Sequence, residues 1–334
     1  GLSEMMNSIH PLPTDSLVLE GPVGVVGAGS VGGWLAAKMQ QAGWPVTLLR
    51  KPGGLESGEE TTKKIHVNGE ATGDFSTEVP CIEIDQDGPV FRWLFITVKA
   101  GDLQAVAKQI QGRIDAKTTL VFPGNGLDLW SHFEGCGTDR FLIAATTYGL
   151  YRENPGEISV RGAGGEITVA PVGRFDEGPF LTKQLTDAIT SLGLTAVTAD
   201  DGPEVVWKKS ILSAGLNPVC ALLGIENGQL PGSTGFLLAN AASEEARSVA
   251  IAEGFDLPHV KVDRALVELC EKTATNRCSM LQDLDSGMGT EVDAINGAIV
   301  RRGQELKIPT PANRLLLELV SGLTTKTPLK MTAN

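Results

Sequence analysis

The alternation of apolar and polar positions is clearest near the N-terminus, where a short apolar strand leads into a glycine-rich turn. Val23–Val26 is apolar apart from one glycine, and a helical pattern follows the turn over residues 33–42 and ends at Gly43. A second apolar run, residues 46–49, comes soon afterwards. Strand, turn, helix and strand in this order predict a βαβ unit that opens a parallel sheet.

Further apolar runs of strand length follow at intervals that suit an alternating α/β domain. They are residues 93–98, 118–122, 141–145 and 195–198. Asp102 is predicted to cap a helix that reaches about Gln111. Residues 158–160 and 167–170 flank the glycine-rich segment 161–165, and this arrangement predicts a hairpin.

The pattern changes at Asp200-Asp201-Gly202-Pro203, after which helical periodicity replaces the strand pattern almost completely. The length of 334 residues also favours two domains over one. We therefore expect an N-terminal arm over residues 1–19, a Rossmann domain with a doubly wound, mostly parallel sheet over residues 20–199, and an all-α catalytic domain over residues 200–334. The predicted fold class is α/β with this second, helical domain.

Composition indicates a globular protein and limits its partners. Apolar residues make up 42% of the chain and charged residues 20%. The net charge is −12 and the pI is about 4.9, so nucleic acid is not an expected partner. A small anionic substrate is still compatible with this charge, because a few local cations outweigh the global field at short range.

Cysteine and histidine usage predicts neither a disulfide framework nor a metal site. The five cysteines include no C-x-x-C pair, and the four histidines are scattered. No apolar stretch approaches the roughly 20 residues that span a bilayer. The arm lacks the basic-then-apolar order of a signal peptide. We expect a cytoplasmic protein without a membrane span.

The glycine-rich turn is the first candidate binding site. Its sequence is Gly27-Ala28-Gly29-Ser30-Val31-Gly32. Gly27 permits a tight turn, Gly29 lets the backbone approach a pyrophosphate, and Gly32 lets helix and strand pack closely. A merely structural turn is the alternative. The strand before the turn and the helix after it favour dinucleotide binding.

The end of the second strand indicates which dinucleotide binds. NAD-binding domains usually carry an acid there for the ribose 2′-hydroxyl, whereas this chain has Leu48-Leu49-Arg50-Lys51. A guanidinium suits a 2′-phosphate, so the sequence favours NADP(H), with Arg50 ranked above Lys51. A solvated basic loop is the alternative.

Lys99 and Asn125 follow two other predicted strands. Ligands of open α/β sheets bind beyond the carboxyl ends of the strands, so both residues are candidates for cofactor contacts. Each can equally be an ordinary turn residue.

The first predicted helix of the second domain carries a polar stripe. Asp201 and Pro203 mark its start, and Lys209, Ser213 and Asn217 then recur four residues apart on one face. Pro218 is predicted to disturb the helix and to leave the carbonyl of residue 214 without a partner. The alternative interpretation of the stripe is a surface helix with one solvent-exposed polar face.

A second polar cluster lies near the C-terminus and includes Asn276, Ser279 and Glu291. Thr290 is predicted to cap a new helix, with Asp293 in a capping-box position. Glu291 would then lie in the first turn, where an acid can simply complement the helix dipole.

Together these segments resemble the ketopantoate reductase (2-dehydropantoate 2-reductase) family over residues 23–319. The anchors are Gly27-Ala28-Gly29-Ser30-Val31-Gly32, Thr97-Val98-Lys99, Asn125-Gly126, Trp207-Lys208-Lys209, Asn217-Pro218, Ser279-Met280-Leu281-Gln282-Asp283, Thr290-Glu291-Val292-Asp293, Ile295-Asn296-Gly297 and Ile308-Pro309-Thr310-Pro311-Ala312-Asn313. The resemblance implies a Rossmann domain followed by a helical domain, with NADPH and substrate in the cleft between them. It also implies a homodimer.

The resemblance implies a role for each matching residue. Lys209 corresponds to the lysine that protonates the carbonyl oxygen, and Glu291 to the glutamate that helps bind the substrate hydroxyl. The positions that hold the substrate match Asn217, Asn276 and Ser279. Those near the cofactor match Arg50, Lys99 and Asn125.

Ser213 departs from the family, which usually has asparagine one turn after the lysine. A hydroxyl is shorter and offers one donor, so the departure bears on the substrate more than on the cofactor or the reaction. The leading hypothesis is NADPH-dependent reduction of 2-dehydropantoate to pantoate. The alternatives are reduction of another 2-oxo acid or ketone on the same fold, and a non-enzymatic NADP(H)-binding regulator.

Overall fold

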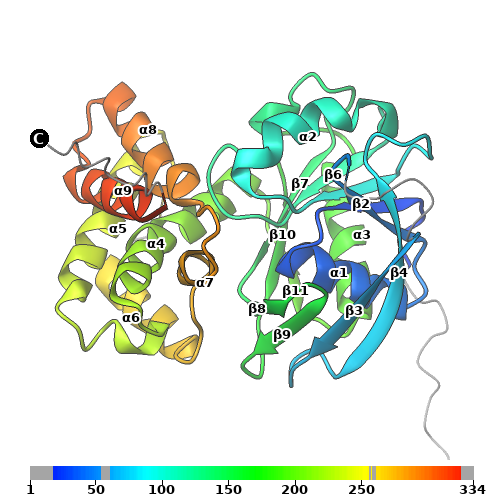
Figure 1. Ribbon diagram of the computed structural model, residues 1–334. Coiled ribbons are helices and arrows are strands. Elements are labelled where there is room, and N and C mark those ends of the chain that lie inside the picture. The colour runs from blue at the N-terminus through cyan, green and yellow to red at the C-terminus, as the bar shows by residue number, and fades with distance from the viewer. Residues whose placement is uncertain (1–17, 54–60, 256, 258–260, 325–334) are drawn as a thin grey trace, which may run out of the picture.

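The computed structural model describes residues 18–53, 61–255, 257 and 261–324. An α/β part and a helical part lie side by side (Figure 1). Eleven strands of the described residues form one sheet in the order β11-β10-β7-β6-β5-β1-β2-β4-β3-β9-β8. The strands are β1 (Val23–Val26), β2 (Val46–Arg50), β3 (Thr62–Asn68), β4 (Phe75–Glu83), β5 (Trp93–Ile96), β6 (Thr119–Phe122), β7 (Phe141–Thr146), β8 (Gly149–Asn154), β9 (Glu157–Arg161), β10 (Ile167–Pro171) and β11 (Ala196–Thr198).

The helices of the α/β part flank this sheet, and those of the second part pack on one another. They are α1 (Ser30–Gln41), α2 (Leu103–Gln109), α3 (Gly178–Ser191), α4 (Gly202–Leu223), α5 (Gly235–Ala252), α6 (Val262–Lys272), α7 (Ser279–Asp285), α8 (Ala298–Leu306) and α9 (Pro311–Thr324). A π-helical turn, η5 (Asp293–Gly297), precedes α8, and a 3₁₀ turn, η4 (Asn227–Gln229), follows α4.

The centre of the sheet is parallel, as the sequence predicts. β1 pairs in parallel with β2 and β5, and β5, β6 and β7 continue the same direction. The predicted strands at 93–98, 118–122, 141–145 and 195–198 correspond to β5, β6, β7 and β11. The predicted fold class, α/β with a Rossmann part and a helical part, is confirmed.

The predicted hairpin around residues 161–165 is wrong. β9 pairs with β3 and β8, whereas β10 pairs with β7 and β11 near the opposite end of the sheet. The glycine-rich segment is therefore a crossing between distant strands. Three strands, β3, β4 and β8, lie outside every predicted strand because their alternating patterns are largely polar.

Two predicted helix caps also differ from the structure. Asp102 makes no capping hydrogen bond, because its carboxylate pairs with Lys51 at 3.0 Å. The expected capping box at Thr290 and Asp293 is absent from η5, where Thr290 accepts a bond from the Val292 amide at 3.4 Å and Asp293 binds Arg301 at 2.9 Å. The helix start after residue 200 is confirmed, since the Asp201 side chain accepts from the Glu204 amide at 3.3 Å.

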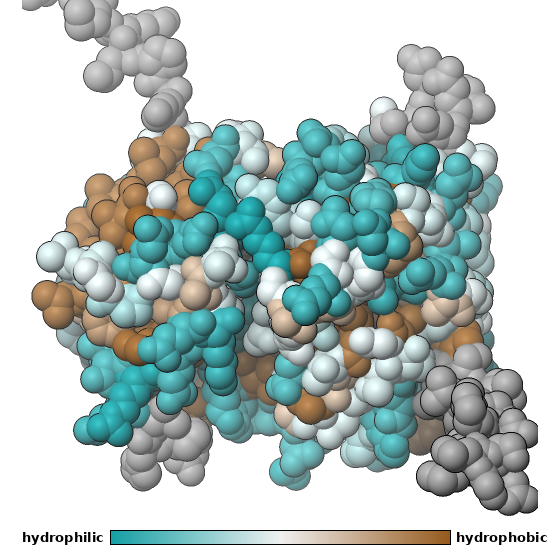
Figure 2. All heavy atoms as spheres, turned by 90° about the horizontal axis from the view of Figure 1, so that it is seen from below, coloured by the Kyte–Doolittle hydropathy of each residue, from teal (hydrophilic) through white to brown (hydrophobic). Residues whose placement is uncertain are grey.

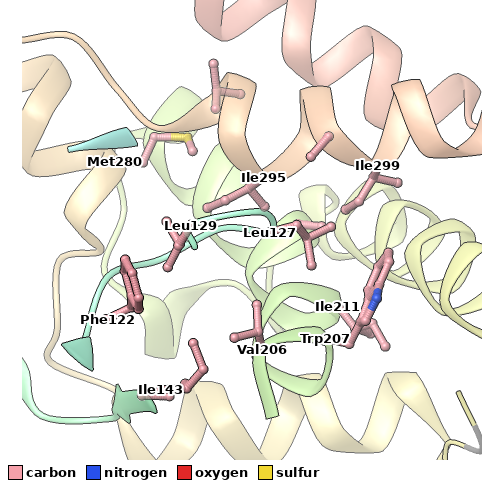
Figure 3. Close-up of a cluster of buried hydrophobic side chains, with 14 of the residues drawn as sticks. Phe122, Leu127, Leu129, Ile143, Val206, Trp207, Ile211, Met280, Ile295 and Ile299 are labelled. Carbon is pink, nitrogen blue, oxygen red and sulfur yellow. The ribbon is translucent and has the colours of Figure 1, made fainter. Parts of the chain in front are cut away.

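One hydrophobic core joins the two parts. Phe122, Leu127 and Ile143 from the α/β part and Trp207 and Ile295 from the helical part belong to the same buried cluster (Figure 3). A second cluster lies between α1 and the opposite face of the sheet. The shared core fixes the helical part against the carboxyl ends of the central strands, where the candidate site lies.

Candidate active site

A cavity of about 280 Å³ lies where the carboxyl ends of the central strands meet α4 and α7. It is lined by eleven of the candidate residues, namely Gly29, Ser30, Val31, Lys99, Asn125, Lys209, Ser213, Asn217, Asn276, Ser279 and Glu291. They come from both parts of the molecule and from segments up to 262 positions apart. A wider hollow of about 870 Å³ between α3 and β11 contains none of them.

The glycine turn has the geometry of an anion-binding loop. Gly27 has a φ of +100°, and a Cβ on Gly32 would lie 2.2 Å from the Gly27 carbonyl oxygen. A Cβ on Gly29 would meet nothing within 4 Å, so this side of the loop is open. No side chain caps α1 and its first turn carries no acid, which leaves its N-terminal amides available to a phosphate.

Lys209 projects from α4 toward this cavity. Its Nζ donates to the Thr146 carbonyl at 2.9 Å, which anchors the ammonium at the end of β7. Burial lowers the pKa of Lys209 from 10.5 to about 8, and the nearby charge of Glu291 partly opposes this shift. The side chain can therefore both carry and release a proton near neutral pH. Ser213 and Asn217 line the same cavity, as expected from their shared helix face.

Pro218 shapes α4 behind the polar stripe. It lies inside the helix and has no amide hydrogen for the Ala214 carbonyl. Asn296 supplies the missing donor at 2.9 Å and also donates to the Asn313 side-chain oxygen at 3.0 Å. The Ala214 carbonyl lacks its helical donor, as predicted, but it accepts the Asn296 bond and so is not without a partner. The predicted disturbance of the helix is wrong, because α4 continues through Pro218 to Leu223. A buried amide network holds this part of α4 in place.

Glu291 lines the same cavity as Lys209, and the charge of each affects the pKa of the other. Burial is the main cause that raises its pKa from 4.5 to about 7, and the charge of Asp283 adds to this effect. Lys99 binds Asp283 at 2.8 Å and the Gly289 carbonyl at 2.9 Å. Lys99 thus ties the end of β5 to the segment that carries Glu291.

Arg50 and Ala28 lie outside this cavity, in an adjoining hollow of about 640 Å³. The Arg50 Nε atom is buried and has no hydrogen-bond partner. Gly27 and Gly32 line neither space. They instead allow the backbone conformation and close packing of the turn. The predicted cofactor residues that line a space are therefore divided between two adjoining hollows.

Two family models cover most of the chain. Ketopantoate reductase PanE/ApbA matches residues 23–174, and Ketopantoate reductase PanE/ApbA C terminal matches residues 203–324. The chain belongs to the ketopantoate reductase family. It is accordingly an oxidoreductase that acts on a carbonyl group or the corresponding alcohol.

Relatives of this ketopantoate reductase family member align over nearly its whole length. The 2-dehydropantoate 2-reductase of Archaeoglobus fulgidus is 30% identical, and the alignment covers 90% of this chain and 97% of that protein. A solved PanE/ApbA family ketopantoate reductase from Ralstonia eutropha is 26% identical with a TM-score of 0.75 and covers 90% of this chain and 98% of that chain. A D-mandelate dehydrogenase with NADH and anilino(oxo)acetate has a TM-score of 0.81 at 23% identity, covers 90% of this chain and 98% of that chain, and shows a shared fold.

Two cavity residues of this reductase family member were not found by sequence reasoning. Asn227 lies on η4, donates to Thr273 at 3.0 Å and keeps its buried side-chain oxygen without a partner. Asp283 forms an ion pair with Lys99, and its charge raises the pKa of Glu291. The sequence gives no sign of Asn227, because it does not recur at helical spacing from Lys209. Asp283 lies four residues after Ser279, and this spacing predicts that both side chains share one helix face.

Over the described ranges, no group of three or more His, Cys, Asp or Glu residues could hold a metal ion. In the same part of the chain, no helix is long and apolar enough to cross a membrane. Within the described residues, none of the five cysteines forms a disulfide.

Proposed function

We propose that the protein reduces 2-dehydropantoate to pantoate with NADPH and that Lys209 is the general acid. NADPH, when bound, supplies the hydride that reaches the carbonyl carbon. The observation that carries the proposal is the buried ammonium of Lys209, which shares one cavity with the strand ends and the glycine turn. A carbonyl that accepts a hydride develops negative charge on oxygen, and a positioned ammonium both stabilises and protonates that oxygen.

The bond from Lys209 to the Thr146 carbonyl supports this role, because it fixes the direction of the ammonium while two of its protons stay available. The lysine must be protonated at the start of reduction, and a pKa of about 8 meets this requirement at neutral pH. Proton transfer to the alkoxide leaves a neutral amine, which recovers its proton from solvent before the next turnover.

The remaining polar residues suit a substrate with a carboxylate and a hydroxyl. Ser279, Asn217 and Asn276 offer neutral donors from α7, α4 and the loop before α7. Neutral donors can hold a carboxylate without adding a second buried cation near Lys209. Glu291, when ionised, is an acceptor for the substrate hydroxyl. Asn227 adds an unpartnered amide oxygen to the same wall.

The residues at the glycine turn fit a dinucleotide, and Arg50 favours the phosphorylated form. Gly29 leaves open space in front of the α1 amides, and Gly32 admits no side chain beside the Gly27 carbonyl. Arg50 offers a buried guanidinium nitrogen without a partner. β2 ends in this arginine and not in the acidic residue that would bind a ribose 2′-hydroxyl. A guanidinium pairs with a phosphate through two parallel bonds, which a ribose hydroxyl cannot match.

Reduction of a different 2-oxo acid is the second candidate, and Ser213 favours it. A serine next to Lys209 leaves more space than the asparagine usual in the family. The relatives named 2-dehydropantoate 2-reductase support the first candidate. Turnover of NADPH with 2-dehydropantoate and with a series of 2-oxo acids decides between them, with the product identified by mass spectrometry. Efficient turnover of another acid alone, without formation of pantoate, would refute the first candidate.

The protein is also proposed to act as a homodimer. The structural neighbour described as a dimeric ketopantoate reductase from Staphylococcus aureus supports this assembly. On α9, Leu315, Leu319 and Leu323 recur at four-residue intervals with 47%, 47% and 44% of their surface exposed. Figure 2 shows that hydrophobic residues gather on the surface of the helical part. Sedimentation of the protein and of Leu319→Asp tests the proposal, since a dimer through this face becomes monomeric in the variant.

A further inference from the structure

The hollow beside the glycine turn is strongly basic. It is lined by Ala28, Arg50, Lys51, Thr62, Lys63, Lys64 and Glu78, which are four cations, one acid and two uncharged residues. The whole chain carries a net charge of −12, so this concentration of positive charge runs against the composition. A basic hollow in an acidic protein indicates an anionic ligand.

The sheet register brings Lys63 to the same face as Arg50. On β2, Arg50 and Leu48 point to one face, and Leu48 lies opposite Cys81 of β4. Val79 shares the face of Cys81 and lies opposite Lys63 of β3. Leu48, Val79 and Cys81 belong to the core beneath α1, so both cations lie on the α1 side.

Strand direction brings the two cations to the same edge of the sheet. β3 runs antiparallel to β4, so its first residues lie toward the end of β4. β4 is parallel to β2, and β2 is parallel to β1, which leads into the glycine turn. Lys63, although 13 residues beyond Arg50, thus approaches the phosphate-binding edge from a neighbouring strand.

The other charges of the hollow have nearer partners. Lys51 pairs with Asp102 at 3.0 Å, and Lys64 lies opposite Glu78 in the register of β3 and β4. Within the described residues, neither Arg50 nor Lys63 forms an ion pair, and the Arg50 Nε atom is buried without a partner. Burial is the first cause that lowers the pKa of Lys63, and the charges of Arg50 and Arg152 lower it further. The two unpaired cations therefore repel each other in the free protein.

We propose that Lys63 and Arg50 together bind the ribose 2′-phosphate of NADPH and that Lys63 is a determinant of the preference for NADPH over NADH. The inference rests on the proposed use of NADPH. A phosphate dianion between the two cations would replace their repulsion by attraction. Arg50 can present its planar fork, and the flexible Lys63 can supply a point charge from the facing strand.

Binding of adenosine nucleotides isolates this contact from catalysis. We would measure the affinity of 2′,5′-ADP and of 5′-ADP calorimetrically for the wild type, Lys63→Gln and the matched control Lys64→Gln. Loss of one charged phosphate contact predicts roughly ten- to hundredfold weaker binding of 2′,5′-ADP to Lys63→Gln. The affinity for 5′-ADP stays unchanged. Lys64→Gln removes the same charge from the other face, and its effect on 2′,5′-ADP stays within about threefold.

Equal effects of Lys63→Gln and Lys64→Gln on 2′,5′-ADP would overturn the inference, because only the general basic field would then matter. Equal binding of 2′,5′-ADP and 5′-ADP by the wild type would instead contradict the proposed preference for NADPH itself. Thermal unfolding provides a second readout without nucleotide. Lys63→Gln is expected to unfold at the wild-type temperature or above it, since a repulsion is removed, whereas a lower temperature would identify Lys63 as a structural residue.

Discussion

Replacement of Lys209 by methionine is the most informative perturbation of the site. The change removes the ammonium and retains an unbranched side chain that can fill the same space. The proton for the carbonyl oxygen and the charge that stabilises this oxygen are lost together. Loss of general acid catalysis alone lowers rates roughly 10²- to 10⁴-fold. That corresponds to about 3–5 kcal/mol of transition-state stabilisation.

The same variant should retain or gain stability. Lowering the pKa of Lys209 from 10.5 to about 8 corresponds to about 3 kcal/mol of destabilisation of the charged lysine in the folded protein. This cost is fully present below about pH 8 and disappears as pH rises from there to 10.5, where the lysine is also neutral in the unfolded chain. At pH 7 the cost outweighs one lost bond to Thr146 of about 1–3 kcal/mol.

The assay measures turnover of NADPH with 2-dehydropantoate, NADPH affinity by fluorescence, and unfolding in urea for the same samples. Lys208→Met is the matched control, because Lys208 is the adjacent lysine on α4, is exposed and pairs with Glu204 at 2.8 Å. We expect Lys209→Met to lose turnover with wild-type NADPH affinity and Lys208→Met to keep both. A turnover within about threefold of the wild type in Lys209→Met would refute the assignment of the acid.

The pH profile of kcat/KM for reduction is expected to be bell-shaped, because Lys209 loses its proton above about pH 8 and Glu291 loses its charge below about pH 7; Glu291→Gln should remove the acidic limb, and an unchanged limb in this variant would exclude Glu291 as its source. Asn296→Ala leaves the Ala214 carbonyl and the Asn313 oxygen without their donor and should lower the free energy of unfolding by about 2–4 kcal/mol in urea; a loss below about 0.5 kcal/mol would show that water replaces the amide. Ser213→Asn should raise kcat/KM for 2-dehydropantoate relative to bulkier 2-oxo acids, and a fall in this ratio would mean that Ser213 already suits the natural substrate.

Local sequence patterns are sufficient to predict the elements that surround the glycine turn and the polar face of α4. β1, α1 and β2 follow from contiguous apolar runs and a motif whose glycines each have a steric reason. The stripe of Lys209, Ser213 and Asn217 needs only the helical period, and the freed carbonyl at residue 214 needs only the missing amide of Pro218.

Long-range pairing could not be predicted from the same patterns. Nothing local shows that β9 pairs with β3, about 90 residues earlier, so local patterns alone predict a hairpin around the glycine-rich segment after β9. β3 carries Lys63 among exposed positions and lacks the apolar run that marks a central strand. Asp102 can cap a helix on local grounds, but Lys51 offers it a charged partner that only the fold brings near.

The decisive measurement of the role of Lys209 is the structure of the complex with NADP⁺ and pantoate. We expect the 2-hydroxyl of pantoate within hydrogen-bond distance of Lys209 Nζ, with the carbon that bears it facing the nicotinamide ring. We expect the pantoate carboxylate to lie among Ser279, Asn217 and Asn276. Pantoate bound with its carboxylate, and not its 2-hydroxyl, on Lys209 would contradict the proposed mechanism.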